Sequence, residues 1–529
     1  MAKSIAHSER RSPCARRYLT PIALAASLVV LVGCGGSGAS HQPAGGRTGG
    51  SSSAAGSAAA PTTAASARKT RPNIVFVLTD DLAWNLVPYM PHVVQMQRRG
   101  ATFSNYFVTD SLCCPSRASI LTGGFPHDTR VYDNSPPEGG YRVFRERGEE
   151  AQTFAVALQR AGYRTALMGK YLNGYKPGAQ DGRGRPYVPP GWSEWDVAGN
   201  GYPEYGYRMN SNGQVRAYGY QRGDYLTDVL ARKGLSFIDR SAARRQPFLL
   251  ELATFAPHAP YTPAPHDALA FPGLQAPRTP AFNTIGSSEP AWLSHFAPLG
   301  AGQVATIDAK FRKRAQAVQA VDRMIAQIES RLAADGVARD TYIVFSSDNG
   351  LHMGEHRLKP GKLTAFDTDI RVPLIVTGPG VPAGETVAQL TENVDLCPSF
   401  ERLAGARVPA SVDGRSLVAL MHGRRAPNWR REILVEHHGR VYDRGDPDLP
   451  ARGSGNPPSY EAIRTPHSLY VEYAGGEREY YDLPRDPFEL NNVAGRLSGA
   501  HALRLHRTLA GIEGCHGARA CWRAQHGPT

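Results

Sequence analysis

The sequence NIVFVL at residues 73–78 is a continuous apolar run that is rich in β-branched residues. The run is too short for a helix, and its lack of polar alternation is typical of a strand buried on both faces of a parallel sheet. Similar apolar runs recur along the chain, and we interpret each of them as a further buried strand. They lie at 163–169, 247–255, 341–347 and 373–378.

Two helical patterns lie between these predicted strands. Residues 227–239 favour a helix, and residues 312–334 carry apolar side chains at three- and four-residue spacing. Strands that alternate with helices predict an α/β fold, in which helices cover both faces of a mostly parallel central sheet.

Polar side chains follow four of the predicted strands, at the point where each strand ends. In an open parallel sheet, ligands bind beyond the carboxyl ends of the strands, so we expect these side chains to share one site. They are Thr79, Asp80 and Asp81 after the first strand, Lys170 after the second, His258 after the third, and Asp348 and Asn349 after the fourth.

Three of these carboxylates and one amide form a candidate metal site, made of Asp80, Asp81, Asp348 and Asn349. Such a set offers only oxygen ligands, which suit the hard cations Ca²⁺ and Mg²⁺. In isolation, a TDD segment is more often a helix N-cap and a DNG segment is more often a turn. Their shared position after buried strands favours metal binding, and no His and Cys residues cluster at zinc spacing.

The composition narrows the class of protein and of partner. With 529 residues, 41% of them hydrophobic and 20% charged, the chain can bury a large core and form one large domain and a smaller one. Its formal net charge of +13 favours anionic partners. Because the basic residues are scattered, without zinc-finger spacing or interleaved aromatic residues, we expect a small or polymeric anion and no nucleic acid.

The N-terminus has the pattern of a secretion signal. Basic residues extend to Arg17, and the apolar run at 22–33 is too short to span a bilayer comfortably. The sequence LVGC, which ends at Cys34, resembles the lipobox of bacterial lipoproteins, in which the cysteine is lipidated; an ordinary cleaved signal is the alternative. We expect a signal peptide over 1–33, which is removed, and a flexible linker over 34–70, whose lipidated Cys34 anchors a secreted protein to the bacterial cell membrane.

The other cysteines fall into three settings. Cys515 and Cys521 are six residues apart, and outside the cytoplasm this spacing predicts a small disulfide loop. Cys397 lies in the apolar segment VDLCPSF, which predicts a buried thiol. Cys113 and Cys114 are adjacent and have no evident partner.

The segment CCPSRASILTG at 113–123 has the pattern C-x-P-S-R-x-x-x-L-T-G, which resembles the signature of the type I sulfatases in the alkaline phosphatase-like superfamily. The segments RPNIVFVLTDD, AGYRTALMGKYLNGY, APHAPYTPAP and SSDNGLHMGEH are similar to those of the glucosamine-6-sulfatase and extracellular heparan sulfatase branch. The likeness extends over about residues 71–490. We expect a catalytic domain over 71–425 and a smaller α+β subdomain over 426–529, which walls the cleft.

The resemblance implies a sulfuric ester hydrolase that acts on a sulfated sugar or glycosaminoglycan of the 6-O-sulfoglucosamine type. In this family a separate formylglycine-generating enzyme oxidises the first cysteine of the signature, so Cys113 is expected to become formylglycine, while Cys114 fills a variable position. A formylglycine hydrate carries two hydroxyls. One attacks sulfur, and the other, once deprotonated, expels the sulfate, which a cysteine cannot do.

The resemblance also assigns roles to two groups of residues. The ligands of Ca²⁺, with Mg²⁺ as the alternative, would be Asp80, Asp81, Asp348, Asn349 and the modified Cys113. The residues that orient the formylglycine, hold the sulfate and act on the leaving oxygen would be Arg117, Lys170, His258 and Lys362, with Asp348 as the base for the attacking hydroxyl.

One position departs from the family pattern. Many arylsulfatases have a histidine two places after the lysine that corresponds to Lys170, whereas this chain has Leu172 there and Asn173 next. The sequence leaves open which group supplies that contact. It also leaves open whether His258 or Lys362 is the proton donor to the leaving oxygen.

Two other functions compete with a sulfatase. Phosphodiesterases and phosphonate monoester hydrolases of the same superfamily include enzymes with the same modified cysteine. A degenerate lipoprotein that binds sulfated glycans without turnover is the non-enzymatic alternative. The intact set of predicted metal and cationic residues favours catalysis.

Overall fold

The computed structural model describes residues 71–526, which belong to one compact unit. The predicted signal peptide, the lipidation of Cys34 and the linker over 34–70 lie outside the described residues. Within 71–526, no helix combines the length and the apolar content that crossing a bilayer requires.

A ten-stranded sheet forms the centre of the fold, in the order β11-β2-β10-β9-β1-β8-β4-β5-β6-β7. Five adjacent strands are parallel, from β9 to β5 in that order, and β10, β6 and β7 each pair antiparallel to a neighbour. The five strands predicted from the sequence are all present. They are β1 (Asn73–Thr79), β4 (Arg164–Gly169), β8 (Phe248–Ala253), β9 (Thr341–Ser347) and β10 (Leu374–Thr377).

The central strand β1 explains why its sequence has no polar alternation. All seven of its residues are buried, and it pairs with β8 on one side and β9 on the other. Ile74 and Phe76 belong to one hydrophobic core, whereas Val75 and Val77 belong to another. Since successive side chains point to opposite faces of a strand, the sheet separates two cores and both faces of β1 must be apolar.

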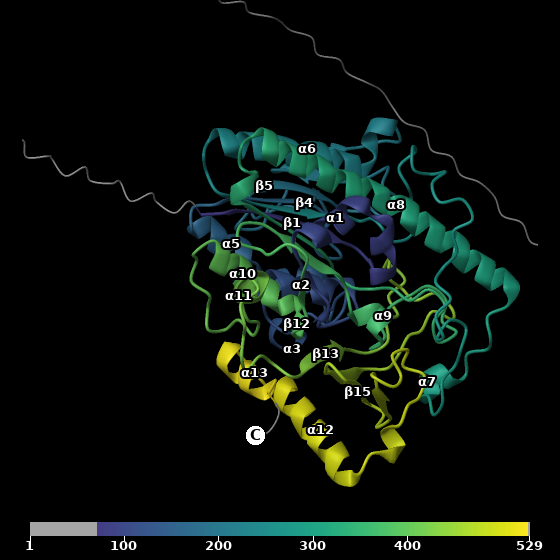
Figure 1. Ribbon diagram of the computed structural model, residues 1–529. Helices are drawn as coiled ribbons and strands as arrows, with labels where there is room; N and C mark the ends of the chain where they lie inside the picture. The colour runs from purple at the N-terminus through teal and green to yellow at the C-terminus, as the bar shows by residue number, and fades with distance from the viewer. Residues whose placement is uncertain (1–70, 527–529) are drawn as a thin grey trace, which may run out of the picture. The chain divides into compact units, whose positions relative to one another are not determined.

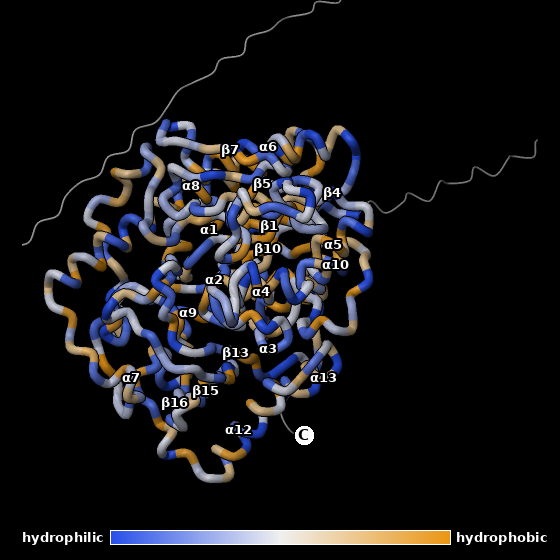
Figure 2. The backbone as a smooth tube through the Cα atoms, turned by 180° about the vertical axis from the view of Figure 1, so that it is seen from behind, coloured by the Kyte–Doolittle hydropathy of each residue, from blue (hydrophilic) through white to orange (hydrophobic). Residues whose placement is uncertain are grey.

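Helices cover both faces of this sheet, as predicted (Figure 1). The core that contains Val75 is closed by α1 (Pro91–Arg99), α6 (Leu226–Ala243) and α8 (Ala301–Ala334). The core that contains Ile74 is closed by α2 (Cys113–Thr122), α5 (Phe154–Arg160) and α10 (Leu396–Leu403). Figure 2 shows the same two layers from behind, with α6 and α8 on one side of β1 and α5 and α10 on the other.

The long helix α8 begins at Ala301, well before the predicted start at residue 312. Its first turns are mostly exposed and bury few apolar side chains, so they carry little of the periodic signal that marks the rest of the helix. The thiol of Cys397 is free and buried in α10, as predicted.

The C-terminal region forms a smaller antiparallel sheet of four strands, in the order β13-β14-β15-β16. Its strands are β13 (Ile433–His437), β14 (Tyr460–Arg464), β15 (Ser468–Tyr473) and β16 (Arg478–Asp482). Helix α12 (Gly499–Glu513) packs on this sheet, and a disulfide between Cys515 and Cys521 joins its end to α13 (Ala518–Ala524). The fold class is therefore confirmed, whereas the domain boundary at 425/426 stays a prediction.

The remaining elements are short and lie at the sheet edges or between the main elements. The strands are β2 (Ala101–Phe103), β3 (Tyr106–Phe107), β5 (Glu194–Ala198), β6 (Arg208–Ser211), β7 (Gln214–Ala217), β11 (Glu385–Val387) and β12 (Thr391–Glu392). The helices are α3 (Pro126–Thr129), α4 (Gly140–Glu146), α7 (Ala291–Ser294), α9 (Asp367–Ile370) and α11 (Val418–Met421).

Candidate active site

The carboxyl ends of β1, β9, β8 and β4 bring the predicted polar residues into one buried cluster. Asp80 and Asp81 follow β1 directly, and Asp348 follows β9. Asp81 has a left-handed backbone with φ of 63°, a conformation that Asp tolerates better than most residues. The turn lets both neighbouring carboxylates face the same cluster instead of opposite faces of the sheet.

The carboxylate cluster has the chemistry of a cation site. One oxygen from each of Asp80, Asp81 and Asp348 and the sulfur of Cys113 all lie within 4.8 Å of one another, and all four residues are buried. The side-chain nitrogen of Asn349 donates to Asp81 at 2.7 Å, while its Oδ1 is buried without a hydrogen-bond partner. Three close carboxylates and an unused buried acceptor suit a divalent cation that prefers oxygen ligands.

Cys113 is the first residue of α2, a helix whose ten residues are all buried. Its sulfur lies 3.2 Å from Oδ1 of Asp80 and 2.9 Å from Nζ of Lys362. Burial raises the pKa of the Cys113 thiol, and the nearby carboxylates of Asp348 and Asp448 raise it further. As a cysteine, this residue would stay a neutral thiol, which is a poor nucleophile.

Arg117 lies about one turn after Cys113 on the same helix. Its Nε donates to Oδ2 of Asp348 at 2.7 Å. Burial lowers the pKa of Arg117, but the charges of Asp348 and Asp80 outweigh that effect and the pKa is raised. Oδ1 of Asp348 also accepts the backbone N–H groups of Asp81 and Asn349, so this carboxylate is held firmly in one orientation.

Two lysines predicted for the site contact its carboxylates. Nζ of Lys170 lies 2.6 Å from Oδ2 of Asp80, and Nζ of Lys362 lies 2.7 Å from Oδ1 of Asp81. Burial lowers the pKa of each lysine, but the surrounding carboxylates outweigh that effect and raise it, so both lysines are charged. Of the two, Lys362 also contacts the sulfur of Cys113, so its charge is placed to attract an anion held there.

His258 completes the predicted set. Its Nε2 lies 2.6 Å from Oδ1 of Asp448 and 3.6 Å from Oδ2 of Asp81, and its Nδ1 lies 2.8 Å from the carbonyl of Ala259. Burial lowers the pKa of His258, but Asp81 and Asp448 outweigh it and raise the pKa to about 9. The imidazole is thus a cation at neutral pH, and its ring packs against Tyr202 with centroids 4.5 Å apart.

Asp448 is a site residue that sequence reasoning missed. It lies in the loop between β13 and β14, and its side chain is buried among those of the site. In addition to His258, its carboxylate contacts Nζ of Lys362 at 2.8 Å and accepts a hydrogen bond from Nδ2 of Asn134 at 2.7 Å. Burial raises the pKa of Asp448, but Lys362 and His258 outweigh it and lower the pKa well below its usual range. The segment GDPDLP carries no strand or motif signal that could have singled it out.

The structure shows what the residues at the departure after Lys170 contact. Leu172 is buried in the apolar core that lies on the α2 side of the sheet, so it supplies no polar contact. Asn173 donates through Nδ2 to Oδ2 of Asp448 at 3.3 Å. The polar contact from this turn therefore comes from Asn173 and acts through Asp448.

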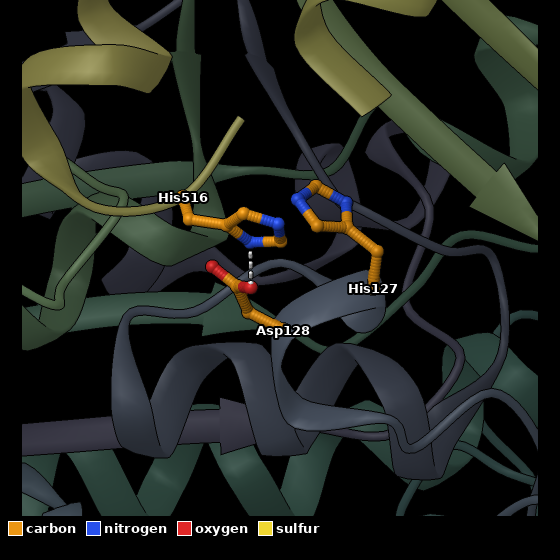
Figure 3. A group of neighbouring side chains, drawn as sticks. All are labelled: His127, Asp128 and His516. Carbon is orange, nitrogen blue, oxygen red and sulfur yellow. Dashed lines mark hydrogen bonds and ion pairs between the residues drawn. The ribbon is translucent and has the colours of Figure 1, made fainter. Parts of the chain in front are cut away.

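A second group of potential metal ligands, His127, Asp128 and His516, lies on α3 and the C-terminal segment (Figure 3). Both nitrogens of His127 are already engaged, with Nδ1 3.0 Å from Glu436 and Nε2 2.8 Å from the carbonyl of Cys515. Burial lowers the pKa of His127, but the bond to Glu436 outweighs it and raises the pKa to about 9. A protonated imidazole cannot bind a metal, so this group ties the C-terminal segment to α3 instead.

Comparison with known proteins identifies the family. The model of the sulfatase family matches residues 72–406, and the model described as N-sulphoglucosamine sulphohydrolase, C-terminal, matches residues 354–511. Human N-acetylglucosamine-6-sulfatase is 34% identical over 479 residues, which cover 85% of this chain and 86% of that protein.

Solved structures show the same fold. BT4656, in complex with its substrate D-glucosamine-2-N,6-O-disulfate, superposes with a TM-score of 0.69 at 23% identity, over 84% of this chain and 97% of that one. The phosphonate monoester hydrolase from Silicibacter pomeroyi superposes with a TM-score of 0.62 at 24% identity, over 82% and 93%. Because a phosphonate monoester hydrolase also has this fold, the fold alone does not identify the reaction. The family model and the 34% identity to N-acetylglucosamine-6-sulfatase do identify the family. The chain belongs to the sulfatase family, whose members hydrolyse sulfuric esters.

Proposed function

We propose that this chain removes the 6-O-sulfate from a glucosamine-type sugar, with Cys113 oxidised to formylglycine and Ca²⁺ bound beside it. The observation that carries the proposal is the position of Cys113, whose sulfur lies 3.2 Å from a carboxylate and 2.9 Å from a lysine ammonium. The substrate class is supported by the 34% identity to N-acetylglucosamine-6-sulfatase.

The residues that would hold the cation are Asp80, Asp81, Asp348, Asn349 and the oxidised Cys113. Their oxygen donors suit Ca²⁺, with Mg²⁺ as the alternative. When bound, the cation would lower the pKa of the hydrate at residue 113 and polarise a sulfate oxygen. The formylglycine hydrate would supply the attacking hydroxyl and, through its second hydroxyl, the means to release the sulfate.

The charges of the cluster favour an anionic substrate once the cation is present. Asp80, Asp81, Asp348 and Asp448 carry four negative charges, and Arg117, Lys170, Lys362 and protonated His258 carry four positive charges. The formal charges of these eight side chains thus sum to zero, and a divalent cation beside them would leave a net charge of +2. A buried excess of positive charge would stabilise the negative oxygens of a sulfate ester.

Proton transfer is assigned to two fixed side chains. Asp348 would accept the proton of the attacking hydroxyl, because Arg117 and two backbone N–H groups hold its carboxylate beside Cys113. His258 would donate a proton from Nε2 to the leaving oxygen. Its pKa of about 9 is closer to neutrality than that of Lys362, which is raised well above 10.5, and a proton donor works best when its pKa is near the working pH.

The location we propose is outside the cytoplasm, at the bacterial cell membrane through lipidated Cys34. The disulfide between Cys515 and Cys521 supports an oxidising compartment. A separate formylglycine-generating enzyme would be required for maturation.

The test is a comparison of substrates with protein of known state at residue 113. We expect sulfate release from N-acetylglucosamine-6-sulfate, slower turnover of 4-nitrophenyl sulfate and little turnover of bis(4-nitrophenyl) phosphate, with Cys113→Ala as the inactive control. Faster turnover of the phosphate diester would instead identify a phosphodiesterase. Binding of the sugar without any turnover by formylglycine-bearing protein would identify a non-catalytic binding protein.

A further inference from the structure

A basic groove lies beside the candidate active site and takes no part in the chemistry proposed above. Its volume is about 670 Å³, within the range of small-molecule sites. The side chains that give the groove its character are Trp292, Phe296, Arg357, Lys359, Arg440 and Arg452.

The charge of this groove is uncompensated. Four of its lining residues carry a permanent positive charge and none is acidic. Arg357 donates to the carbonyl of Phe296 at 3.2 Å, and Lys359 donates to the carbonyl of Arg452 at 3.0 Å. Among residues 71–526, none of these four cations forms an ion pair with an acidic side chain. A concave surface whose charged lining residues are all cations attracts anions.

The groove and the candidate active site are built from the same two loops. Lys359 in the groove lies three residues before Lys362 in the site, and Pro450 in the groove lies two residues after Asp448. Because each residue spans at most about 3.6 Å, the Cα atoms of Lys359 and Lys362 are within about 11 Å. The groove and the site are thus separated by a short stretch of chain, and the inference requires that a ligand longer than the reacting sugar spans this distance.

The two loops are held together by direct contacts. The backbone N–H of Lys359 donates to the carbonyl of Gly453 at 2.8 Å, and Nε2 of His352 lies 3.0 Å from the carbonyl of Ser454. His352 is itself fixed by Asp369, 2.9 Å from its Nδ1. The two loops that form the groove are thus fixed relative to each other.

Aromatic side chains accompany the cations. Trp292 is buried in the wall, Phe296 is half-buried, and Tyr442 is 70% exposed at the rim. Aromatic side chains beside charged donors suit a ligand with both apolar faces and anionic groups. A sugar ring that carries a sulfate or a carboxylate has this character.

We propose that the basic groove binds an anionic sugar unit next to the one that is desulfated, so that the protein prefers oligosaccharides to monosaccharides. The inference rests on the proposed function in one respect, the identity of the substrate as a sulfated sugar. Binding in the groove does not require catalysis, so the two can be tested separately.

The test uses Arg440→Glu/Arg452→Glu, because both side chains are exposed and neither belongs to the candidate active site. The matched control is Arg504→Glu/Arg507→Glu, which reverses two exposed charges on α12. The probes are a sulfated glucosamine–uronic acid tetrasaccharide and N-acetylglucosamine-6-sulfate. Binding of the tetrasaccharide is measured by calorimetry in the Cys113→Ala background, and turnover of both probes is measured in the active protein.

We expect the groove variant to bind the tetrasaccharide about tenfold more weakly, in line with the loss of two exposed charge contacts and their replacement by repulsion. KM of the groove variant for the monosaccharide should stay within twofold of the value for the unmodified protein. In the control variant, both the tetrasaccharide affinity and the monosaccharide KM should stay within twofold. Equal tetrasaccharide affinity in the groove and control variants would overturn the inference. A third outcome separates the two proposals. If the protein desulfates neither sugar, but only the groove variant binds the tetrasaccharide more weakly, the proposed function is overturned and the groove is established.

Discussion

Asp448→Asn tests most sharply whether Asp448, in the loop between β13 and β14, supports catalysis or only stabilises the fold. The carboxylate of Asp448 is fully buried, 2.6 Å from Nε2 of His258 and 2.8 Å from Nζ of Lys362. An asparagine of nearly the same shape removes the negative charge and leaves two cations facing a neutral amide. The perturbation is therefore electrostatic and changes the packing little.

The expected size follows from these contacts. A hydrogen bond to a charged group contributes about 1.5–3 kcal/mol, and each 1.4 kcal/mol changes a rate about tenfold, so kcat/KM should fall about 10- to 100-fold. Leaving a buried charge without its partner costs about 3–5 kcal/mol, so the thermal unfolding midpoint should also fall. Because Asp448 helps to raise the pKa of His258 to about 9, the pH above which activity declines should move to lower values in the variant.

The assay is sulfate release from N-acetylglucosamine-6-sulfate as a function of pH, together with thermal unfolding. Asp443→Asn is the control, since Asp443 lies in the same loop and is exposed; it should keep kcat/KM within twofold. A kcat/KM for Asp448→Asn within twofold of the unmodified protein, with an unchanged pH profile, would refute the role that we assign to Asp448.

Three further predictions follow from the site and its surroundings. Cys113→Ala should abolish turnover without lowering the unfolding midpoint. Cys114→Ala should keep turnover within twofold, because burial raises the pKa of the Cys114 thiol to about 12 and keeps it inert. A comparable loss of turnover in both variants would argue against Cys113 as the reacting residue. Dialysis against a Ca²⁺ chelator should reduce turnover more than about 100-fold, because removing a group that stabilises charge in the transition state costs on this order. Added Ca²⁺ should restore turnover. Full turnover by protein shown to be metal-free would contradict the cation site. Glu436 raises the pKa of His127 from its usual 6.5 to about 9, so this pair stabilises the fold by on the order of 3 kcal/mol below pH 6.5, and that stabilisation is lost as the pH rises toward 9. The unfolding midpoint should therefore fall over this pH range, and Glu436→Gln should flatten the fall; equal slopes in the two proteins would be inconsistent with the pair.

Local sequence pattern was sufficient for the central sheet because its strands are buried on both faces. The continuous apolar run of β1 is typical of this environment, and β8 and β9 are likewise buried along their whole length. The start of α8 was missed because its first turns are mostly exposed and carry little periodicity. The apolar sequence pattern thus identifies a helix or strand only where its side chains are buried.

The candidate site divides in the same way. Asp80, Asp348 and Lys170 could be predicted because each follows a buried strand, and the topology of a parallel sheet brings such positions together. Lys362 lies in a loop and was identified only through the resemblance to the sulfatases. Asp448 was missed by both routes, since the contact between its loop and the main sheet is a tertiary one that no local pattern encodes.

The state of Cys113 tests the account most directly. Peptide mass spectrometry across residues 106–130 can be applied to preparations that differ in activity, for example those made with and without a formylglycine-generating enzyme. The account predicts that the fraction of residue 113 found as an aldehyde or its hydrate rises in proportion to the specific activity. Full specific activity in protein whose residue 113 is an intact thiol would contradict it.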